Sequence, residues 1–258
     1  MPDSGSVAEA EPAAAPSEPV VVAKAESSTY TPEPGPARTL PRKGRITFNV
    51  VSGRDRFPVG RTVQSWAVDG DRYQLASTSE TTGIVDLFRS QHRNYFSRGT
   101  VTREGLRPET FLVSRDRGRA RGIDEARARF NWDTASITLG PASAQRAEPL
   151  LPRSQDLVSM MFQLGLDPPP PGRMRLPVTN GSRLDVYEIE VLPEEAIETP
   201  LGTLRALPLK QVRIAREETM QVWLASEYRY LPVRIVFFNR DGEPAGEQMV
   251  SEIRLSEE

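Results

Sequence analysis

From residue 45 onward the chain is built of short runs in which apolar and polar residues alternate, separated by turn residues. Ile46, Phe48 and Val50 form the first such run, and Ser52-Gly53 ends it. An alternation with a period of two predicts β-strands that bury one face. We therefore expect a mainly β domain, in the form of a curved antiparallel sheet or an open or half β-barrel.

Turn signals divide the alternating part of the chain into strands. Asp69-Gly70 and Asp241-Gly242 are strong hairpin signals, and residues 105–108 mark a further connection. The strands that we expect lie at residues 46–50, 59–68, 73–77, 93–103, 109–114, 126–132, 136–139, 173–178, 184–191, 203–214, 219–225, 231–238 and 247–255.

One helix is expected among these strands, at residues 154–164. Ser154 is a good N-cap, and Asp156 in the first turn favours the helix dipole. Gly165 and the prolines at 168–171 end the helix. Its apolar stripe, which we expect to pack on the concave side of the sheet as a fixed plug or a movable wall, consists of Leu157, Val158, Met161 and Phe162. A second helical turn is expected at 85–90.

The first 44 residues have a different composition, dominated by Ala, Pro, Glu and Ser. Such a segment cannot bury enough apolar surface to offset its loss of conformational entropy, so we expect a disordered linker there. Residues 45–258 then form a single β-rich domain. The chain has no apolar run near the ~20 residues of a membrane-spanning helix, and it shows no signal peptide or anchor at its start.

Composition excludes several kinds of chemistry. The chain has no cysteine, which removes disulfides, thiolate catalysis and cysteine-bound metals. His92 is the only histidine, and we expect it on the surface or in a loop, without a catalytic role. We therefore assign no catalytic residue, no metal and no cofactor. The net charge of −2 argues against nucleic acid as a partner.

Large aromatic side chains on separate predicted strands are the candidates for a binding site. They are Trp66, Tyr73, Tyr95, Tyr187 and Trp223, and Trp132 and Phe237 belong to the same set. In a curved sheet, alternate residues of each strand face one concave surface. The rings would then line a pocket for a lipid or another hydrophobic ligand, closed by Met161 and Phe162 of the helix. The alternative is that they form an ordinary packed core.

Several short segments, read in order, carry a family resemblance. They are Gly99 with Gly105-Leu106-Arg107-Pro108-Glu109-Thr110-Phe111, Phe130-Asn131-Trp132, Gln155-Asp156-Leu157-Val158-Ser159, Thr199-Pro200-Leu201-Gly202, Trp223-Leu224-Ala225 and Leu231-Pro232-Val233-Arg234-Ile235. Together they resemble a bacterial family known only as domain of unknown function 3108, over about residues 45–255. Asn131 stands where the pattern of that family has aspartate.

The resemblance implies a β-rich domain of the periplasm or cell envelope, without assigned catalytic residues. The end of the chain, with Trp223 on one strand and Pro232-x-Arg234 on the next, is also similar to half-barrel lipoprotein carriers. Members with a proline-rich N-terminal region often carry a membrane anchor before it, and no anchor is visible in this sequence.

We therefore expect a non-enzymatic envelope domain that binds an apolar ligand or an envelope protein. Two alternatives stay open. One is a structural or assembly protein with a solid core and an exposed strand edge as its working surface. The other is a carbohydrate hydrolase, which needs two carboxylates facing each other across a cleft. The adjacent pairs Glu194-Glu195, Glu217-Glu218 and Glu257-Glu258 are more simply read as solvated strand ends.

Overall fold

The structure, a computed structural model, describes residues 39–53, 55–81, 92–116, 122–213 and 217–256. The chain divides into two units, Met1–Gly35 and Pro36–Glu258. The fold and the site given below concern the described residues of the second unit. The expected linker at 1–44 lies almost entirely outside the described residues, as does the expected helical turn at 85–90.

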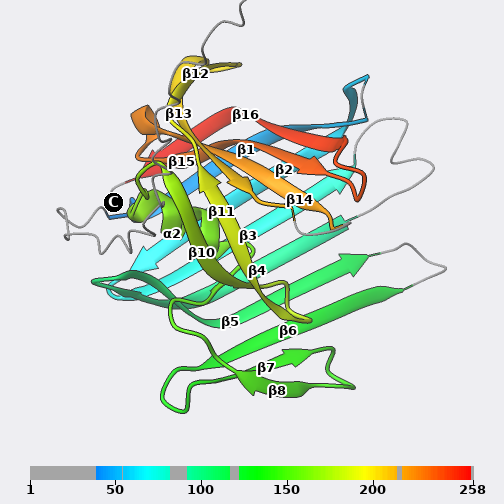
Figure 1. The fold of residues 1–258 in the computed structure, drawn as a ribbon, viewed down its shortest axis with the longest axis vertical. Helices are drawn as coiled ribbons and strands as arrows, with labels where there is room; N and C mark the ends of the chain where they lie inside the picture. Colours follow the sequence, from blue (N-terminus) through cyan, green and yellow to red (C-terminus); the bar gives the residue numbers. More distant parts are fainter. Residues whose placement is uncertain (1–38, 54, 82–91, 117–121, 214–216, 257–258) are drawn as a thin grey trace, which may run out of the picture. The chain divides into compact units, whose positions relative to one another are not determined.

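Sixteen strands form one curved sheet that does not close into a barrel (Figure 1). In sequence order they are β1 (Lys43–Ser52), β2 (Phe57–Asp69), β3 (Arg72–Thr81), β4 (His92–Thr102), β5 (Gly105–Asp116), β6 (Ile123–Asn131), β7 (Ser136–Gly140), β8 (Arg146–Pro149), β9 (Gln155–Asp156), β10 (Gly172–Thr179), β11 (Leu184–Val191), β12 (Glu195–Thr199), β13 (Gly202–Gln211), β14 (Thr219–Ala225), β15 (Leu231–Phe238) and β16 (Pro244–Ser256). The mainly β, curved architecture expected from the sequence is confirmed.

The strand order explains how the sheet holds both ends of the domain. Neighbours run β8-β7-β6-β5-β4-β3-β2-β1-β16-β15-β14-β13-β11-β10-β9, and β12 pairs with β13 outside this path. The first strand therefore pairs with the last one, β1 with β16. All pairs are antiparallel except the short pairing of β9 with β10.

The far end of the sheet folds back over its beginning. The turn between β10 and β11 reaches the inward side of β5 and β6, where a Cβ added to Gly181 would lie 3.2 Å from the Val113 side chain. The amide of Gly140, at the end of β7, donates a hydrogen bond of 2.9 Å to the carbonyl of Gly181. The concave side of the sheet is thus enclosed from two directions.

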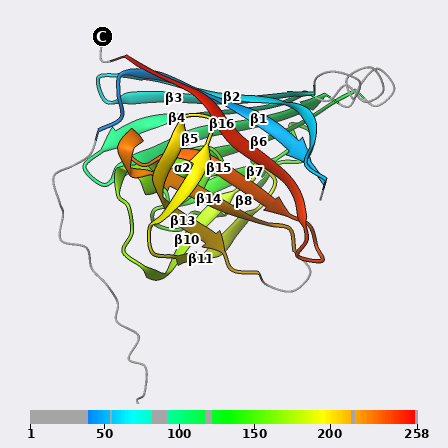
Figure 2. The ribbon, with the colours of Figure 1, turned by 90° about the horizontal axis from the view of Figure 1, so that it is seen from above.

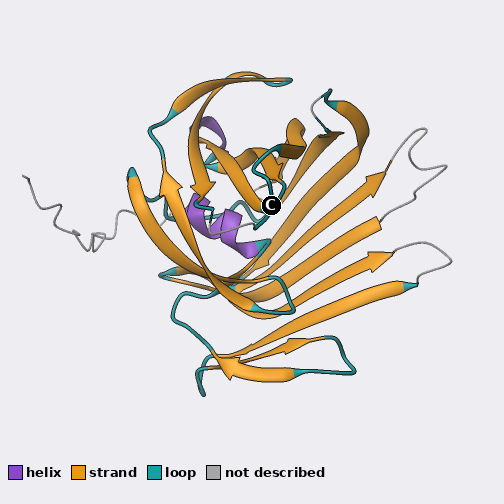
Figure 3. Cartoon of the chain, turned by 45° about the vertical axis from the view of Figure 1, so that its right-hand side comes forward, coloured by secondary structure: helices purple, strands orange, loops and turns teal. Residues whose placement is uncertain are grey.

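Helix α2 (Ser159–Leu166) fills the middle of this curve (Figure 3). It contacts β5 on one side and β15 on the other (Figure 2). Seven of its eight residues are buried, Ser159 to Gly165. Phe162 and Val158 pack into the core of β1 to β7, whereas Met161 packs with β10, β11 and β13 to β15. The helix is therefore buried on all sides, and the single apolar stripe expected from the sequence is wrong.

The helix also begins later than the sequence predicts. Ser154 is not its cap, because the Ser154 hydroxyl donates to the carbonyl of Leu151 at 2.6 Å. Gln155 and Asp156 pair with β10 as β9 instead. The Asp156 carboxylate then accepts the amides of Val158 and Ser159, at 2.9 and 2.8 Å. Hydrogen bonds of this kind satisfy the free amides at the start of a helix, and the helix begins at Ser159.

Gly165 lies inside the helix and does not end it. A Cβ at this position would lie 2.6 Å from the carbonyl oxygen of Tyr230, so glycine allows the helix to pack closely against the β14–β15 connection. The helix ends at Leu166, before the prolines at 168–171.

Most predicted strands are present, with three differences. Residues 105–108 are not a connection: β5 begins at Gly105, and Pro108 lies opposite Gly99 at a register shift, where a ladder tolerates proline. Three short strands, β8, β9 and β12, were not predicted, because two to five residues give no readable period. His92 begins β4, opposite Glu80 and Asp116, so it lies on a strand and not in a loop, and it is partly exposed there.

Residues just before the predicted domain start also belong to the sheet. β1 begins at Lys43. Trp66 donates its ring N–H to the carbonyl of Pro41 at 2.9 Å, and the amide of Val68 donates to the carbonyl of Arg42 at 2.7 Å. These two bonds attach the segment just before β1 to strand β2.

Candidate functional site

A cavity of about 290 Å³ lies between helix α2 and the concave face of the sheet. Its floor comes from β1 to β4, and its opposite wall comes from the start of α2 and from β14 to β16. The polar floor residues are Thr62, Gln64, Ser77 and Ser79, with Arg61, Glu80, Thr81 and Arg93 near the strand ends. The opposite wall consists of Leu157, Val158, Met161, Met220, Ile235, Phe237 and Gln248.

Strand register arranges the inward side chains of β2 to β5 in three rows. The row nearest the strand ends, here called the cationic row, is Thr62, Ser79, Arg93 and Arg115. The middle row is Gln64, Ser77, Tyr95 and Val113, and the core row is Trp66, Leu75, Ser97 and Phe111. Polarity therefore increases along the strands from the core row to the cationic row.

The middle row holds a buried amide without a complete set of partners. Gln64 is only 2% exposed, and in the described part of the chain its Oε1 accepts no hydrogen bond. Gln248 also lines the cavity, and among the described residues its Oε1 likewise accepts no hydrogen bond. A buried acceptor left without a donor destabilises a fold by about 1–3 kcal/mol. Gln64 and Gln248 therefore contribute less to the stability of the fold than apolar side chains at the same positions would.

A buried carboxylate anchors the helix start to the floor. Asp156 is fully buried, and its Oδ2 accepts the Ser97 hydroxyl at 2.5 Å. The Tyr73 hydroxyl lies 3.2 Å from the same Ser97 oxygen. Burial raises the pKa of Asp156 to about 6, although bonds from Ser159, Ser97 and Val158 oppose the shift. Burial and the nearby Asp156 charge likewise raise the pKa of Tyr73.

The structure brings some of the predicted ligand residues to the cavity. Tyr95 and Met161 line it. Tyr187 and Met161 line a second, much smaller space of about 10 Å³, which has room for about one water-sized probe.

Three other predicted residues lie in the packed core beside the cavity. Trp66 and Phe162 form an edge-to-face pair with ring centroids 5.3 Å apart. Tyr73 is 1% exposed, within the same core. These rings lie at or beyond the core row, where the space between helix and sheet is filled.

Trp223 faces away from the cavity. Its neighbours Met220 and Val222 point toward α2, so the alternation of β14 places Trp223 on the outer face. There the hairpin of β12 and β13 covers it: its ring N–H donates to Glu195 at 2.7 Å. The Arg234 guanidinium lies 4.6 Å from the ring centroid.

The cavity residues that sequence reasoning missed are mainly small and polar. Thr62, Gln64, Ser77 and Ser79 carry no motif. A signal was nevertheless present, because Thr62, Gln64 and Trp66 share one face of β2. Polar residues in register with a buried tryptophan indicate an inward face that changes from apolar to polar along the strand.

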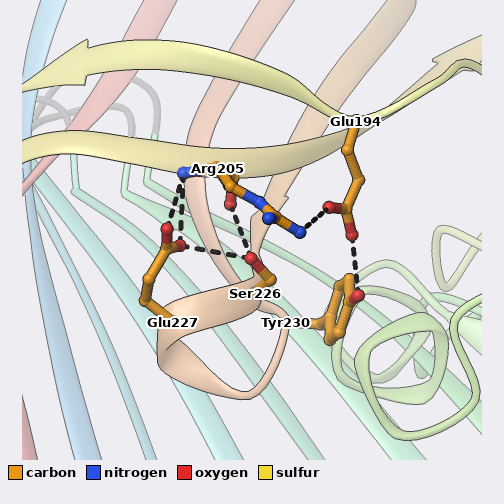
Figure 4. A network of polar contacts seen from close by, with 5 residues as sticks. All are labelled: Glu194, Arg205, Ser226, Glu227 and Tyr230. Carbon is orange, nitrogen blue, oxygen red and sulfur yellow. Dashed lines mark hydrogen bonds and ion pairs between the residues drawn. The ribbon is translucent and has the colours of Figure 1, made fainter.

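The outer hairpin carries a separate polar network (Figure 4). Glu194 binds the Arg205 guanidinium at 2.9 Å and the Tyr230 hydroxyl at 2.7 Å, and these bonds lower its pKa. Glu227 accepts the amide of Arg205 at 2.9 Å, which lowers its pKa as well. Ser226 donates to the Arg205 carbonyl at 3.3 Å. Glu194 and Glu195 are thus engaged in holding this hairpin.

The two buried carboxylates of the described residues do not form a facing pair. Asp156 is on the concave side. Glu247 is on the outer face of β16, where it pairs with Arg234 at 3.1 Å and also with Arg56. Among the described residues, no group of three or more acidic, histidine or cysteine side chains is placed to hold a metal ion. No helix in the described ranges is long and apolar enough to cross a membrane.

Comparison with solved structures finds likenesses at low sequence identity. A β-barrel-like protein of the domain of unknown function DUF1849 from Brucella abortus aligns with a TM-score of 0.57 and 9% identity, over 85% of this chain and 100% of that one. An exported protein, so described, with a YmcC-like fold from Bacteroides fragilis gives a TM-score of 0.32 and 15% identity, over 84% and 99%. A domain described as outer membrane lipoprotein-sorting, from Vibrio parahaemolyticus, gives 0.20 and 10%, over 83% and 85%.

The first of these likenesses supports the β-barrel-like fold, and the other two are too distant to carry an argument. No curated protein matches the chain. The family described as protein of unknown function (DUF3108) has a model that matches residues 43–247, from β1 into β16. The chain therefore belongs to the DUF3108 family, as its sequence segments indicated.

Proposed function

We propose that this domain binds a small hydrophobic or amphiphilic molecule in the cavity between α2 and the sheet, without catalysing a reaction. The observation that carries the proposal is the cavity itself. Its volume of about 290 Å³ lies at the lower end of small-molecule sites, roughly 300–1,000 Å³. Its opposite wall, with Leu157, Met161 and Phe237, offers apolar contact to a ligand.

The polar floor supports the same proposal. A core that served stability alone would gain by placing apolar side chains where Gln64, Ser77 and Ser79 stand, because buried polar groups stabilise only when they are hydrogen-bonded. The Thr62 and Ser79 hydroxyls bond to each other at 2.8 Å, but Oε1 of Gln64 has no donor within the described ranges. A ligand that presents polar groups to this floor accounts for both observations.

The alternative of an edge-strand interaction surface has less support. The edge strand β8 is four residues long and ends at Pro149. Its Arg146 and Glu148 side chains pair at 2.6 Å. Short, charged, proline-containing edges are the kind that resist pairing with another chain. The proposed location, the periplasm or cell envelope, follows from the family resemblance of the sequence.

A neutral, environment-sensitive dye such as Nile red tests the proposal. We expect the purified domain to bind the dye, with enhanced fluorescence, and dodecanol to displace it. Ser79→Trp should fill the cavity from its floor and abolish binding. Thr78→Trp is the matched control, because Thr78 is the preceding residue of β3 and faces outward. Equal dye binding by both folded variants would show that the dye does not occupy the cavity.

A further inference from the structure

We infer that the ligand of the proposed cavity is an anionic single-chain amphiphile, whose headgroup is bound by Arg93 and Arg115 while its chain lies against the apolar wall. This inference rests on the proposed function and specifies the chemistry of its ligand. Its starting point is the register of β4 and β5, in which Arg93 and Arg115 stand directly opposite each other.

Both arginines belong to the inward face of the sheet. Two residues further along, Tyr95 pairs with Val113. Tyr95 lines the cavity and Val113 is buried in the core. Because side chains alternate between faces, Arg93 and Arg115 lie on the same side as these two residues. Arg93 is itself part of the cavity lining.

Two like charges directly opposite on one face of a sheet destabilise it. Arg93 donates a hydrogen bond of 3.4 Å to the Tyr95 hydroxyl. Because this hydroxyl is neutral, the bond does not balance the positive charge of Arg93. Neither Arg93 nor Arg115 takes part in an ion pair among the described residues. Asp124 stands opposite Arg115 on β6, and the ion pairs between described residues do not join these two side chains. An anionic group placed between the two guanidinium groups would therefore remove a repulsion.

The rest of the cavity fits a chain attached to that anion. The cationic row lies at one end of the inward face, and the middle row separates it from the filled core row. Facing these rows are Leu157, Met161 and Ile235. An amphiphile bound with its head at Arg93 would place its chain along this wall. Two adjacent guanidinium groups suit a carboxylate or a phosphate, whose oxygens accept paired N–H donors.

The experiment compares ligands that differ only in the head. Dodecanoate and dodecyl phosphate carry the anion, dodecanol has the same chain without it, and inorganic phosphate supplies an anion without a chain. Calorimetric titration of the whole chain gives a Kd for each. We expect dodecanoate or dodecyl phosphate to bind at least about tenfold more tightly than dodecanol, since hydrogen bonds to charged groups are among the stronger ones. Inorganic phosphate alone should bind far more weakly than either.

Arg93→Gln and Arg115→Gln should each remove most of this preference, so that dodecanoate and dodecyl phosphate bind about as tightly as dodecanol to the same variant. Arg98→Gln is the matched control, because Arg98 is an exposed arginine on the outer face of the same strand, opposite Gln74 and Thr110. The preference should also decrease with salt, as expected for an exposed ion pair.

The outcomes separate the two proposals. If none of the twelve-carbon ligands binds, the proposed function fails. If dodecanol and dodecanoate bind equally, the cavity is a ligand site but the inference about the anionic head is overturned. If the preference exists and survives both arginine substitutions, the head is bound elsewhere, and the assignment to Arg93 and Arg115 is wrong.

Discussion

The two walls of the cavity are both made of regular antiparallel strands, yet they differ in chemistry. The inward residues of β14 and β15 are apolar, with Met220, Val222 and Ile235. The inward residues of β2 and β3 at the same cavity are Thr62, Gln64 and Ser77. The fold therefore does not require polar residues where the sheet encloses the helix. Polar residues are concentrated on the floor, although Gln248 lies on the opposite wall, and this distribution supports the proposed ligand site.

The surroundings of helix α2 also differ from one side to the other: one part is filled by packed side chains, and another part borders open space. Phe162 meets Trp66 in the filled core, whereas Met161 borders both cavities. The sequence interpretation left a fixed plug and a movable wall as alternatives for the helix. Its burial on all sides favours the plug.

The largest expected effect is that of Phe162→Ala. The side chain is 1% exposed, so its truncation should reduce the free energy of unfolding by about 3–5 kcal/mol. Met161→Ala should reduce it by about 2 kcal/mol, at the lower end for core truncations, because the methionine already borders open space. Urea unfolding of both variants measures the difference. A small loss for Phe162→Ala would argue for a mobile helix.

A similar loss is expected for Trp223→Ala on the outer face. Its ring is 6% exposed beneath the β12–β13 hairpin, which predicts a loss of about 3–5 kcal/mol in the free energy of unfolding. Affinity for the dye or the amphiphile should not change in this variant, because Trp223 faces away from the cavity. A selective loss of binding, with the fold intact, would contradict the placement of the site.

The next effect is a dependence of stability on pH through Asp156. Its folded-state pKa of about 6 exceeds the unfolded value of about 3.9, so the folded state binds the proton more tightly. The contribution of this group to the free energy of unfolding should therefore rise as pH falls from 7 through 6, and it should amount to about 1 kcal/mol at pH 5. It should be lost again as pH rises through 6.

Asp156→Asn isolates this effect from other carboxylates. Glu194 and Glu227 have lowered pKa values, so their contributions act in the opposite sense, being lost as pH falls. Asparagine keeps an oxygen for the amides of Val158 and Ser159 and removes the titration. The difference in melting temperature between variant and wild type should therefore change between pH 7 and pH 5, and a constant difference would contradict the raised pKa.

The sequence predicted the strands and the curved sheet because alternation and turn residues are local signals. It misplaced the helix start because Asp156 is held by Ser97, a residue 59 positions away. It placed Trp223 among the ligand candidates because composition does not say which face of a strand is inward. It missed Thr62 and Ser79, since the face that Thr62 shares with Trp66 identifies an inward position only once the burial of Trp66 is known.

The smallest expected effect gives the most direct test of the difference between the walls. Gln64→Leu replaces a buried amide with an apolar side chain of similar size, like those of the opposite wall. Because Oε1 of Gln64 accepts no hydrogen bond among the described residues, the substitution removes an unsatisfied group, and the free energy of unfolding should rise by about 1 kcal/mol. Trp66 and Ser77 flank the site, so Ser77→Ala provides a control of similar burial that does not remove such an acceptor.

If the Gln64 amide serves to bind a ligand, Gln64→Leu should also weaken binding of the anionic amphiphile while it stabilises the domain. A variant that is less stable than the wild type would mean that Gln64 is satisfied in solution, and the polar wall would then need no ligand to explain it.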